Sequence, residues 1–369
     1  IQNRNFAVFL ILFVEASKKD IRALEKEELQ QFFQQHKAPS FKGTQVYQWL
    51  WQKGVHNFDL MTNLSLDHRE LLKQHFEIKH INIDQQQRSS DGTIKNAVQL
   101  HDKLVVESVL IPTSKRTTAC VSSQVGCSLD CVFCATAALK RMRNLNADEI
   151  YDQVVAMNQQ SNYYFERPLS NIVFMGMGEP LMNYKNVLEA IDKITHPEGL
   201  GMSPKRITLS TSGIPKMIRK MADDQVKFGL AVSLHSARQE VREQIMPFAT
   251  KFPLSELSEA LTHWYEYTKK QITFEYVVWE GVNDQKEDIQ ALVKLCRQIP
   301  SKVNLIQYNA IDNSSMKQAP KEVIDAYIHA LTQARIKVTY RRSRGEDIAA
   351  ACGQLANKLE AQGKDTINI

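Results

Sequence analysis

Four of the six cysteines of this 369-residue chain lie in one stretch, CVSSQVGCSLDCVFC, from Cys120 to Cys134. Cys127, Cys131 and Cys134 have the spacing C-x3-C-x2-C. Three thiolates on a short loop can hold three irons of a cubane cluster and leave the fourth iron open to an outside ligand. The alternative is a structural zinc with Cys120 as fourth ligand. The spacing favours the cluster, because zinc sites more often join two separated pairs of ligands.

Several apolar, strand-like runs end in side chains that can bind a ligand. Parallel α/β folds place their sites at the carboxyl ends of the strands, so these side chains are expected on one rim, beside the cysteine loop. Each could instead be a polar group satisfied within an ordinary turn. The residues concerned are Gly178 and Glu179, Ser210, Ser233 and His235, Asn309, and Arg341 and Arg342.

The elements that must position this rim alternate between strand-like and amphipathic helical segments from residue 116 onwards. Such alternation predicts parallel strands with right-handed crossovers, and hence an α/β fold with a partial (βα)6 barrel over residues 116–369. The predicted strands are 117–123, 171–177, 205–211, 228–235, 272–280, 302–309 and 336–342. The predicted helices are 146–160, 183–194, 214–224, 286–299 and 321–334.

The residues before the barrel divide into three segments. Residues 18–80 show helical periodicity and predict a small helical accessory domain, whereas residues 81–115 alternate as short strands and predict a β-extension or linker. Residues 1–17 are an N-terminal extension whose apolar run, 6–14, is too short to span a membrane; a targeting role stays open. The net charge of +5 permits a nucleic-acid partner without requiring one. Clustered cysteines fit a reduced, cytoplasmic setting better than a disulfide framework.

Two further residues draw attention by their surroundings. Alternation in LVVESVLI places Glu107 on an apolar face, where a carboxylate costs free energy unless it is paired, so it is either a buried general base or an edge-strand residue that reaches water. Cys352, in DIAAACGQL, is expected in an early helical turn. There it is either a packing residue or a reactive thiol with room beside its sulfur. Cys296, in an amphipathic helix, is expected in the core.

The cysteine loop, with an aromatic residue before its last cysteine, resembles that of radical S-adenosylmethionine (SAM) enzymes. The later motifs GMGEPLMN, RITLSTSG, AVSLH, EYVVWEGVND, NLIQYN and RGEDIAAACGQL, in this order, resemble the dual-specificity adenine-C2 methyltransferases of 23S rRNA and tRNA, the RlmN family. The resemblance runs from about Lys18 to the C-terminus. The motifs are highly specific in combination, although each alone is not.

The resemblance implies a role for each candidate residue. It assigns a [4Fe–4S] cluster to Cys127, Cys131 and Cys134, the S-methylated position to Cys352, and the proton acceptor to Glu107. Cys120 is then the partner of Cys352 in a transient disulfide rather than a fourth cluster ligand. The implied SAM contacts are Gly178, Glu179, Ser210, Ser233, Leu234, His235 and Asn309.

The resemblance also implies the reaction and the partners. Two SAM molecules are used per turnover, the substrates are adenosine in the peptidyl transferase centre of 23S rRNA and adenosine 37 of some tRNAs, and an electron donor such as flavodoxin serves a monomeric, cytoplasmic enzyme. Basic clusters at Lys140–Arg143, Lys205–Arg206 and Arg341–Arg344 are either contacts to RNA phosphates or solvated surface. Two other functions stay open: methylation at C8 by the sister antibiotic-resistance group, and a non-catalytic Fe–S or zinc RNA-binding protein.

Overall fold

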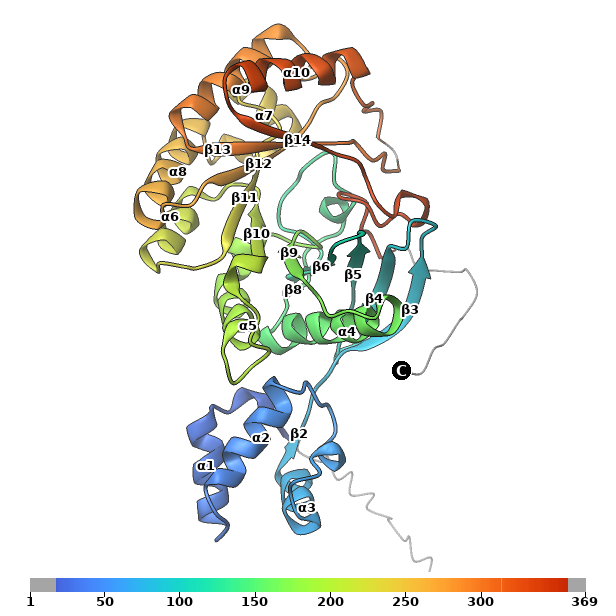
Figure 1. The fold of residues 1–369 in the computed structure, drawn as a ribbon, viewed down its shortest axis with the longest axis vertical. Coiled ribbons are helices and arrows are strands. Elements are labelled where there is room, and N and C mark those ends of the chain that lie inside the picture. Colours follow the sequence, from blue (N-terminus) through green and yellow to red (C-terminus); the bar gives the residue numbers. More distant parts are fainter. Residues whose placement is uncertain (1–17, 313, 358–369) are drawn as a thin grey trace, which may run out of the picture. The chain divides into compact units, whose positions relative to one another are not determined.

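The computed structural model describes residues 18–312 and 314–357 (Figure 1). The chain divides into two compact units between Lys79 and His80. The predicted N-terminal extension, with its apolar run 6–14, lies outside the described residues. Within the described ranges, no helix is long and apolar enough to cross a membrane.

The first unit is built from three helices that bury a small core. Gly43 lets the first two approach closely, since a Cβ there would lie 2.4 Å from the backbone N of Gln30. Core side chains such as Phe33, Val46 and Leu72 are fully buried. The elements are β1 (Lys19–Asp20), η1 (Ile21–Ala23), α1 (Lys26–Gln35), α2 (Phe41–Trp51), η2 (Phe58–Leu60), α3 (Leu66–His75) and β2 (Phe76–Glu77), with β1 and β2 parallel.

The second unit is organised around a ten-stranded sheet in the order β14-β13-β12-β11-β10-β9-β6-β5-β4-β3. Strand β6 and strands β9 to β14 are mutually parallel, whereas β3, β4, β5 and β6 pair antiparallel. The strands are β3 (Asn82–Arg88), β4 (Ile94–Gln99), β5 (Val105–Pro112), β6 (Thr117–Cys120), β9 (Asn171–Phe174), β10 (Ile207–Thr211), β11 (Gly229–Ser233), β12 (Ile272–Val277), β13 (Ser301–Ile306) and β14 (Lys337–Arg341). A small separate ladder joins β7 (Gln124–Val125) and β8 (Arg143–Asn144).

Helices connect the parallel strands and lie along the outer side of the curved sheet (Figure 1). They are α4 (Ala147–Phe165), α5 (Tyr184–Thr195), α6 (Pro215–Asp223), α7 (Gln239–Ile245), α8 (Leu254–Thr268), α9 (Lys286–Gln298) and α10 (Lys321–Gln333). The α/β fold with a partial barrel is confirmed. Helices α7 and α8 were not among the helices predicted from the sequence, although Leu257, Leu261 and Trp264 recur at helical spacing and are buried in α8.

The antiparallel strands continue the barrel sheet without a break. Residue pairs run from Ile94↔Leu110 between β4 and β5 to Val109↔Cys120 between β5 and β6. The segment expected to be an extension or linker therefore supplies the strands at one end of the sheet, β3, β4 and β5. This places Glu107, on β5, one strand away from Cys120.

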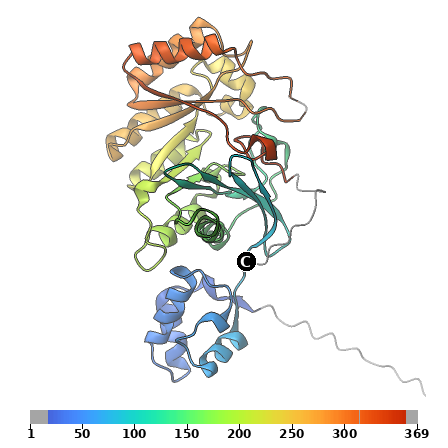
Figure 2. The same cartoon turned by 45° about the vertical axis from the view of Figure 1, so that its right-hand side comes forward.

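The C-terminal strap, defined as residues 345–357, has no α-helix. A short 3-10 helix, η7 (Glu346–Ile348), is followed only by turns and bends. The prediction of a helical turn at Cys352 is wrong, because Gly345 (φ +66°), Ala349 (φ +50°) and Gly353 (φ +85°) have left-handed backbone, which interrupts a right-handed helix. The strap (red) lies beside the blue-green strands β3 to β5 in both views (Figures 1 and 2), and Ser89 Oγ donates to Asp347 at 2.6 Å.

Candidate functional site

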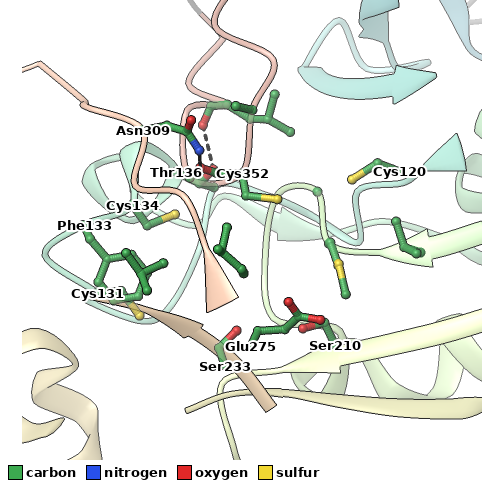
Figure 3. Close-up of a pocket in the computed structure, with 18 of the residues that line it drawn as sticks. Cys120, Cys131, Phe133, Cys134, Thr136, Ser210, Ser233, Glu275, Asn309 and Cys352 are labelled. Carbon is green, nitrogen blue, oxygen red and sulfur yellow. Dashed lines mark hydrogen bonds between the residues drawn. The ribbon is translucent and has the colours of Figure 1, made fainter. Parts of the chain in front are cut away.

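A pocket opens at the carboxyl ends of the parallel strands, between the cysteine loop and the strap (Figure 3). Most of the predicted site residues share its lining, although they come from separate elements. They are Cys120, Cys127, Cys131, Cys134, Gly178, Glu179, Ser210, Ser233, His235, Asn309 and Cys352. Leu234 and Glu107 do not line it.

The cysteine loop is fixed by packing and by backbone contacts. Cys127, Cys131 and Phe133 pack against a buried apolar cluster that includes Trp279 and Met246. The Cys134 N–H donates to the Cys131 carbonyl at 3.2 Å, and the Leu129 N–H donates to Cys127 Sγ at 3.4 Å. The loop therefore has a defined shape that presents its sulfurs to the pocket.

Burial controls the protonation of these thiols. It raises the pKa of Cys127 to about 11 and raises the pKa values of Cys131 and Cys134 as well. Bound iron would supply the positive charge that holds such sulfurs as thiolates. Among the described residues no three Cys, His, Asp or Glu side chains gather round one ion position. In Figure 3, Cys120 lies across the pocket from Cys131 and Cys134. Cys120 is thus set apart from these two loop cysteines rather than grouped with them as a further ligand.

The turn after β9 brings backbone and a carboxylate into the pocket. Gly178 has φ +92°, and a Cβ there would lie 2.4 Å from Gln124 Cβ, so only glycine fits without displacement. Glu179 is 2% exposed; its Oε1 accepts the Leu181 N–H at 3.0 Å and its Oε2 the Ser212 N–H at 2.7 Å. Burial raises the pKa of Glu179, and these donors oppose that shift.

The ends of β10 and β11 are tied together by a buried arginine. The Arg242 guanidinium donates to the carbonyls of Ser212 at 2.6 Å, Ser233 at 3.0 Å, and Leu234. Leu234 is itself fully buried and meets the site only through its neighbours. Burial, and then the Arg242 charge, lower the pKa of His235 to about 3, so its ring is neutral. His235 Nδ1 accepts the Val277 N–H at 3.2 Å.

The strap carries Cys352 into the pocket. Asn309 Nδ2 donates to the Cys352 carbonyl at 3.2 Å, Thr136 Oγ1 donates to the Leu355 carbonyl at 2.6 Å, and the Ala135 N–H donates to the Gly353 carbonyl at 2.7 Å. The Cys352 sulfur points into the same space as Cys134 (Figure 3). Buried Asn309 Oδ1 has no hydrogen-bond partner among the described residues. It is therefore an acceptor available to a ligand.

Glu107 is buried as predicted, with 1% of its surface exposed. Its Oε2 accepts the N–H groups of Ala356 at 2.8 Å and Asn357 at 3.2 Å, both from the strap. Its Oε1 lies 3.5 Å from Lys95 Nζ. The strap thus covers this carboxylate, which explains its absence from the pocket lining.

Comparison with known proteins agrees with this geometry. Residues 19–78 match the ribosomal RNA large subunit methyltransferase N-terminal domain, and residues 121–296 match the radical SAM superfamily. The probable dual-specificity RNA methyltransferase RlmN of Christiangramia forsetii is 67% identical over 94% of this chain and 98% of that protein. The dual-specificity RNA methyltransferase RlmN of Geotalea uraniireducens is 42% identical over 94% and 99%. A radical SAM methyltransferase from Sphaerobacter thermophilus superposes with a TM-score of 0.86 at 34% identity, covering 91% of this chain and 99% of that one.

The chain belongs to the RlmN family. It is a radical SAM enzyme, and membership implies a [4Fe–4S] cluster and SAM. The residues present fit these groups: three half-buried cysteines share one shaped loop, and Asn309, whose Oδ1 has no hydrogen-bond partner among the described residues, lines the same pocket. This confirms the resemblance found in the sequence.

Glu275 is a buried carboxylate of the pocket that was not predicted from the sequence. Glu275, on β12, is buried and lines the pocket; its Oε1 accepts from Asn304 Nδ2 at 3.0 Å, and its Oε2 has no hydrogen-bond partner in the described chain. Burial raises its pKa. A lone carboxylate in the apolar run ITFEYVV is the same signal that identified Glu107, so the sequence did contain the information.

The basic residues near the site differ in their availability. Arg143 is held by carboxylates, with its Nε 2.6 Å from Asp102 Oδ2 and its Nη1 2.7 Å from Glu149 Oε2. It is therefore a structural residue of the loop after the cysteines. Lys140 and Arg141 beside it are exposed. Only this exposed part of the predicted cluster is open to phosphate groups.

Proposed function

We propose that this enzyme methylates C2 of an adenosine in the peptidyl transferase centre of 23S rRNA and of adenosine 37 in some tRNAs, through an S-methylcysteine intermediate. The observation that carries the proposal is the sharing of one pocket by two extra cysteines, Cys120 and Cys352, and the three cysteines of the loop. Electron transfer or structural metal binding would need no such pair. The names of the relatives, dual-specificity RNA methyltransferases, support the substrate class.

The residues divide into those that hold the cofactors and those that act on RNA. Cys127, Cys131 and Cys134 would hold the cluster. The nucleotide would be bound by Gly178, Glu179, Ser210, Ser233, His235 and Asn309, and buried Leu234 would contribute only by supporting its neighbours. Two SAM molecules would be used per turnover. One would supply the methyl group, and the other, with an electron from the cluster, would supply a 5′-deoxyadenosyl radical.

Cys352 is the proposed carrier of the methyl carbon. Its sulfur receives the methyl group, and the same carbon, after losing a hydrogen atom, becomes bonded to adenine C2. The RNA is then tethered to the strap by a sulfur–carbon bond. In the structure the Cys352 sulfur points into the pocket (Figure 3).

Glu107 and Cys120 complete the sequence. Glu107 takes the proton from C2, and the electron pair of the C–H bond stays with the ring, whose unpaired electron would return to the cluster. The Cys120 thiolate then attacks the Cys352 sulfur and a disulfide forms; the electron pair of the carbon–sulfur bond leaves with the nucleotide, and its methylene carbon takes up a proton to become the methyl group. The disulfide needs a two-electron reductant before the next turnover. A flavodoxin-type donor for the cluster, a monomeric state and a cytoplasmic setting belong to the same proposal.

Covalent trapping tests the proposal directly. The Cys120→Ala variant, reconstituted with cluster and given SAM, reductant and a 23S rRNA fragment, should accumulate an RNA–protein adduct at Cys352. The matched Cys352→Ala variant should form no adduct and no product while keeping its cluster. Absence of adduct from Cys120→Ala with a full cluster would contradict the proposed roles.

The two alternatives give different results in the same samples. Mass spectrometry of nucleosides from wild-type reactions should reveal 2-methyladenosine; 8-methyladenosine would indicate the sister reaction. A non-catalytic RNA-binding protein would leave the RNA unmodified and would lose nothing in the Cys352→Ala variant. The uniform naming of the relatives as RlmN favours C2.

A further inference from the structure

Lys95 is a buried lysine that neither the sequence motifs nor the proposed chemistry uses. It lies on β4, where pairs Lys95↔Val109 and Ala97↔Glu107 place it diagonally across from Glu107 on one face of the sheet. Its side chain is 4% exposed, and its Nζ lies 3.5 Å from Glu107 Oε1. Its other described contact, also 3.5 Å long, is the Ala349 carbonyl of the strap.

Burying this amine needs a reason. A buried ion pair rarely stabilises a fold more than apolar residues of the same size would, because both charges lose their hydration. Neither described contact of Lys95 is a short hydrogen bond. Stabilisation of the fold therefore does not explain why Lys95 is buried beside Glu107. The remaining explanation is the effect of Lys95 on the Glu107 carboxylate.

The two oxygens of Glu107 have different surroundings. Oε2 is occupied by two N–H donors from the strap, whereas Oε1 faces Lys95 and has no hydrogen-bond partner among the described residues. The other described hydrogen bonds of Glu107 involve its backbone: Ser122 Oγ donates to its carbonyl at 2.6 Å, and its N–H points at Met177 Sδ. Among the described contacts of this carboxylate, Lys95 is thus the one charged partner.

We propose that Lys95 is a positioning residue that acts through Glu107: it compensates the negative charge of the carboxylate and aims Oε1 at the adenine. This rests on the proposed function, in which Glu107 takes the C2 proton. The proton passes from C2 to Oε1, and the C–H electron pair remains in the ring. When RNA displaces the strap, Oε2 loses its two donors, and Lys95, anchored on β4, still holds the carboxylate.

The experiment compares Lys95→Met with wild-type holoenzyme on RNA carrying hydrogen or deuterium at C2 of the target adenosine. Loss of Lys95 should slow product formation about 10- to 100-fold, less than the roughly 100- to 10,000-fold contribution of a general base itself, because Glu107 is still present. A primary C2 isotope effect larger than that of wild type should appear, because proton removal has become slower. KM for RNA should change less than twofold, and Lys95→Arg should restore most of the rate. Lys193→Met, which removes another buried lysine, on α5, should leave the isotope effect unchanged.

A double-mutant cycle keeps the test decisive if Lys95→Met folds poorly. In the Glu107→Gln background, where the carboxylate on which Lys95 acts is gone, adding Lys95→Met should alter the residual rate less than twofold. A further loss as large as that seen in wild type, or a slow Lys95→Met enzyme with intact cluster and no enhanced isotope effect, would overturn the proposal.

The measurements distinguish failure of the proposed methyltransferase function from failure of the inference about Lys95. If wild-type enzyme forms no methyladenosine, or if Glu107→Gln retains full activity, the proton-acceptor role itself is wrong, and the role of Lys95 falls with it. If Glu107→Gln is impaired but Lys95→Met behaves as wild type, the function stands and only the inference about Lys95 is overturned.

Discussion

Two regions border the pocket: the wall, formed by the cysteine loop and the residues at the carboxyl ends of β9 to β13, and the C-terminal strap. The two are held by different kinds of contact. On the wall, Arg242 ties two strand ends through three carbonyls, and Glu179 accepts two N–H groups inside the core. The strap lacks α-helix and strand, and side chains such as Thr136 and Asn309 hold it by single hydrogen bonds to its backbone. A fixed wall suits the binding of a nucleotide. A strap without helix or strand, held by hydrogen bonds to scattered groups, suits a cysteine that must meet several partners in turn.

The largest loss of methylation activity is expected when a cysteine that would bind the cluster is replaced. Cys131→Ala removes one of three sulfurs, so the cluster should be lost and methylation should fall below detection, more than about 1,000-fold. Iron and sulfide analysis and the visible absorption of the reconstituted protein check this. Substitutions in the strap should leave both measurements unchanged.

Cys296→Ala is the matched control. This cysteine is buried in α9, and its substitution should cost about 1 kcal/mol of stability without loss of iron. Full iron content in Cys131→Ala would break the comparison, since the cysteine loop would then not be the cluster site.

The next effect tests whether the wall is rigid. Gly178→Ala combines left-handed backbone with a Cβ 2.4 Å from Gln124, so it should cost about 2–5 kcal/mol and weaken SAM binding at least tenfold. Gly281→Ala has a similar φ, +70°, but no atom within 4 Å of the new Cβ. It should cost only about 1–2 kcal/mol and leave SAM binding intact. Equal effects in thermal melting and in SAM titration would argue that strain alone matters.

The same division explains how much the sequence could predict. Strands and helices of the wall follow strong apolar periodicity, and the polar residues that end β9 to β13 were located because parallel strands bring their carboxyl ends together. Local pattern and tertiary structure agree there. Glu275 was available by the same logic and was overlooked.

The strap resisted prediction for a physical reason. DIAAACGQL has high helix propensity, but its hydrogen bonds go to Ser89, Thr136 and Asn309, residues distant in sequence. Left-handed backbone at Ala349 and Gly353 completes the departure from a helix. Tertiary contacts override propensity in such segments, and no single-sequence pattern reports them.

A smaller effect concerns Cys120, at the boundary between wall and strap. Burial, and secondarily the neighbouring Cys352, raise the pKa of Cys120 to about 12, while Arg341 opposes the shift. At pH values below this pKa, the thiolate fraction of Cys120 therefore increases about tenfold for each unit by which the pH is raised. Release of RNA from the preformed adduct should therefore accelerate about 100-fold from pH 7 to pH 9, as followed by gel in single turnover.

Adduct formation supplies the contrast for this prediction. Cys120 is not used before release, so the rate of forming the adduct should not follow the same slope. A pH-independent release rate would contradict the assignment of a buried, protonated Cys120 as the nucleophile. It would also indicate that strap movement, not thiol ionisation, limits release.

The smallest effect probes the strap's attachment. Thr136→Val keeps the side-chain shape but removes the donor to the Leu355 carbonyl, which should cost about 1 kcal/mol. Amide exchange at Ala356 and Asn357 should then rise about fivefold, since 1.4 kcal/mol corresponds to tenfold. Thr195→Val removes a comparable hydroxyl bond, to the Ile191 carbonyl in α5, and should leave strap exchange unchanged. Equal exchange in both variants would mean that Glu107, rather than Thr136, holds the strap closed, and Glu107→Gln should then produce the larger increase.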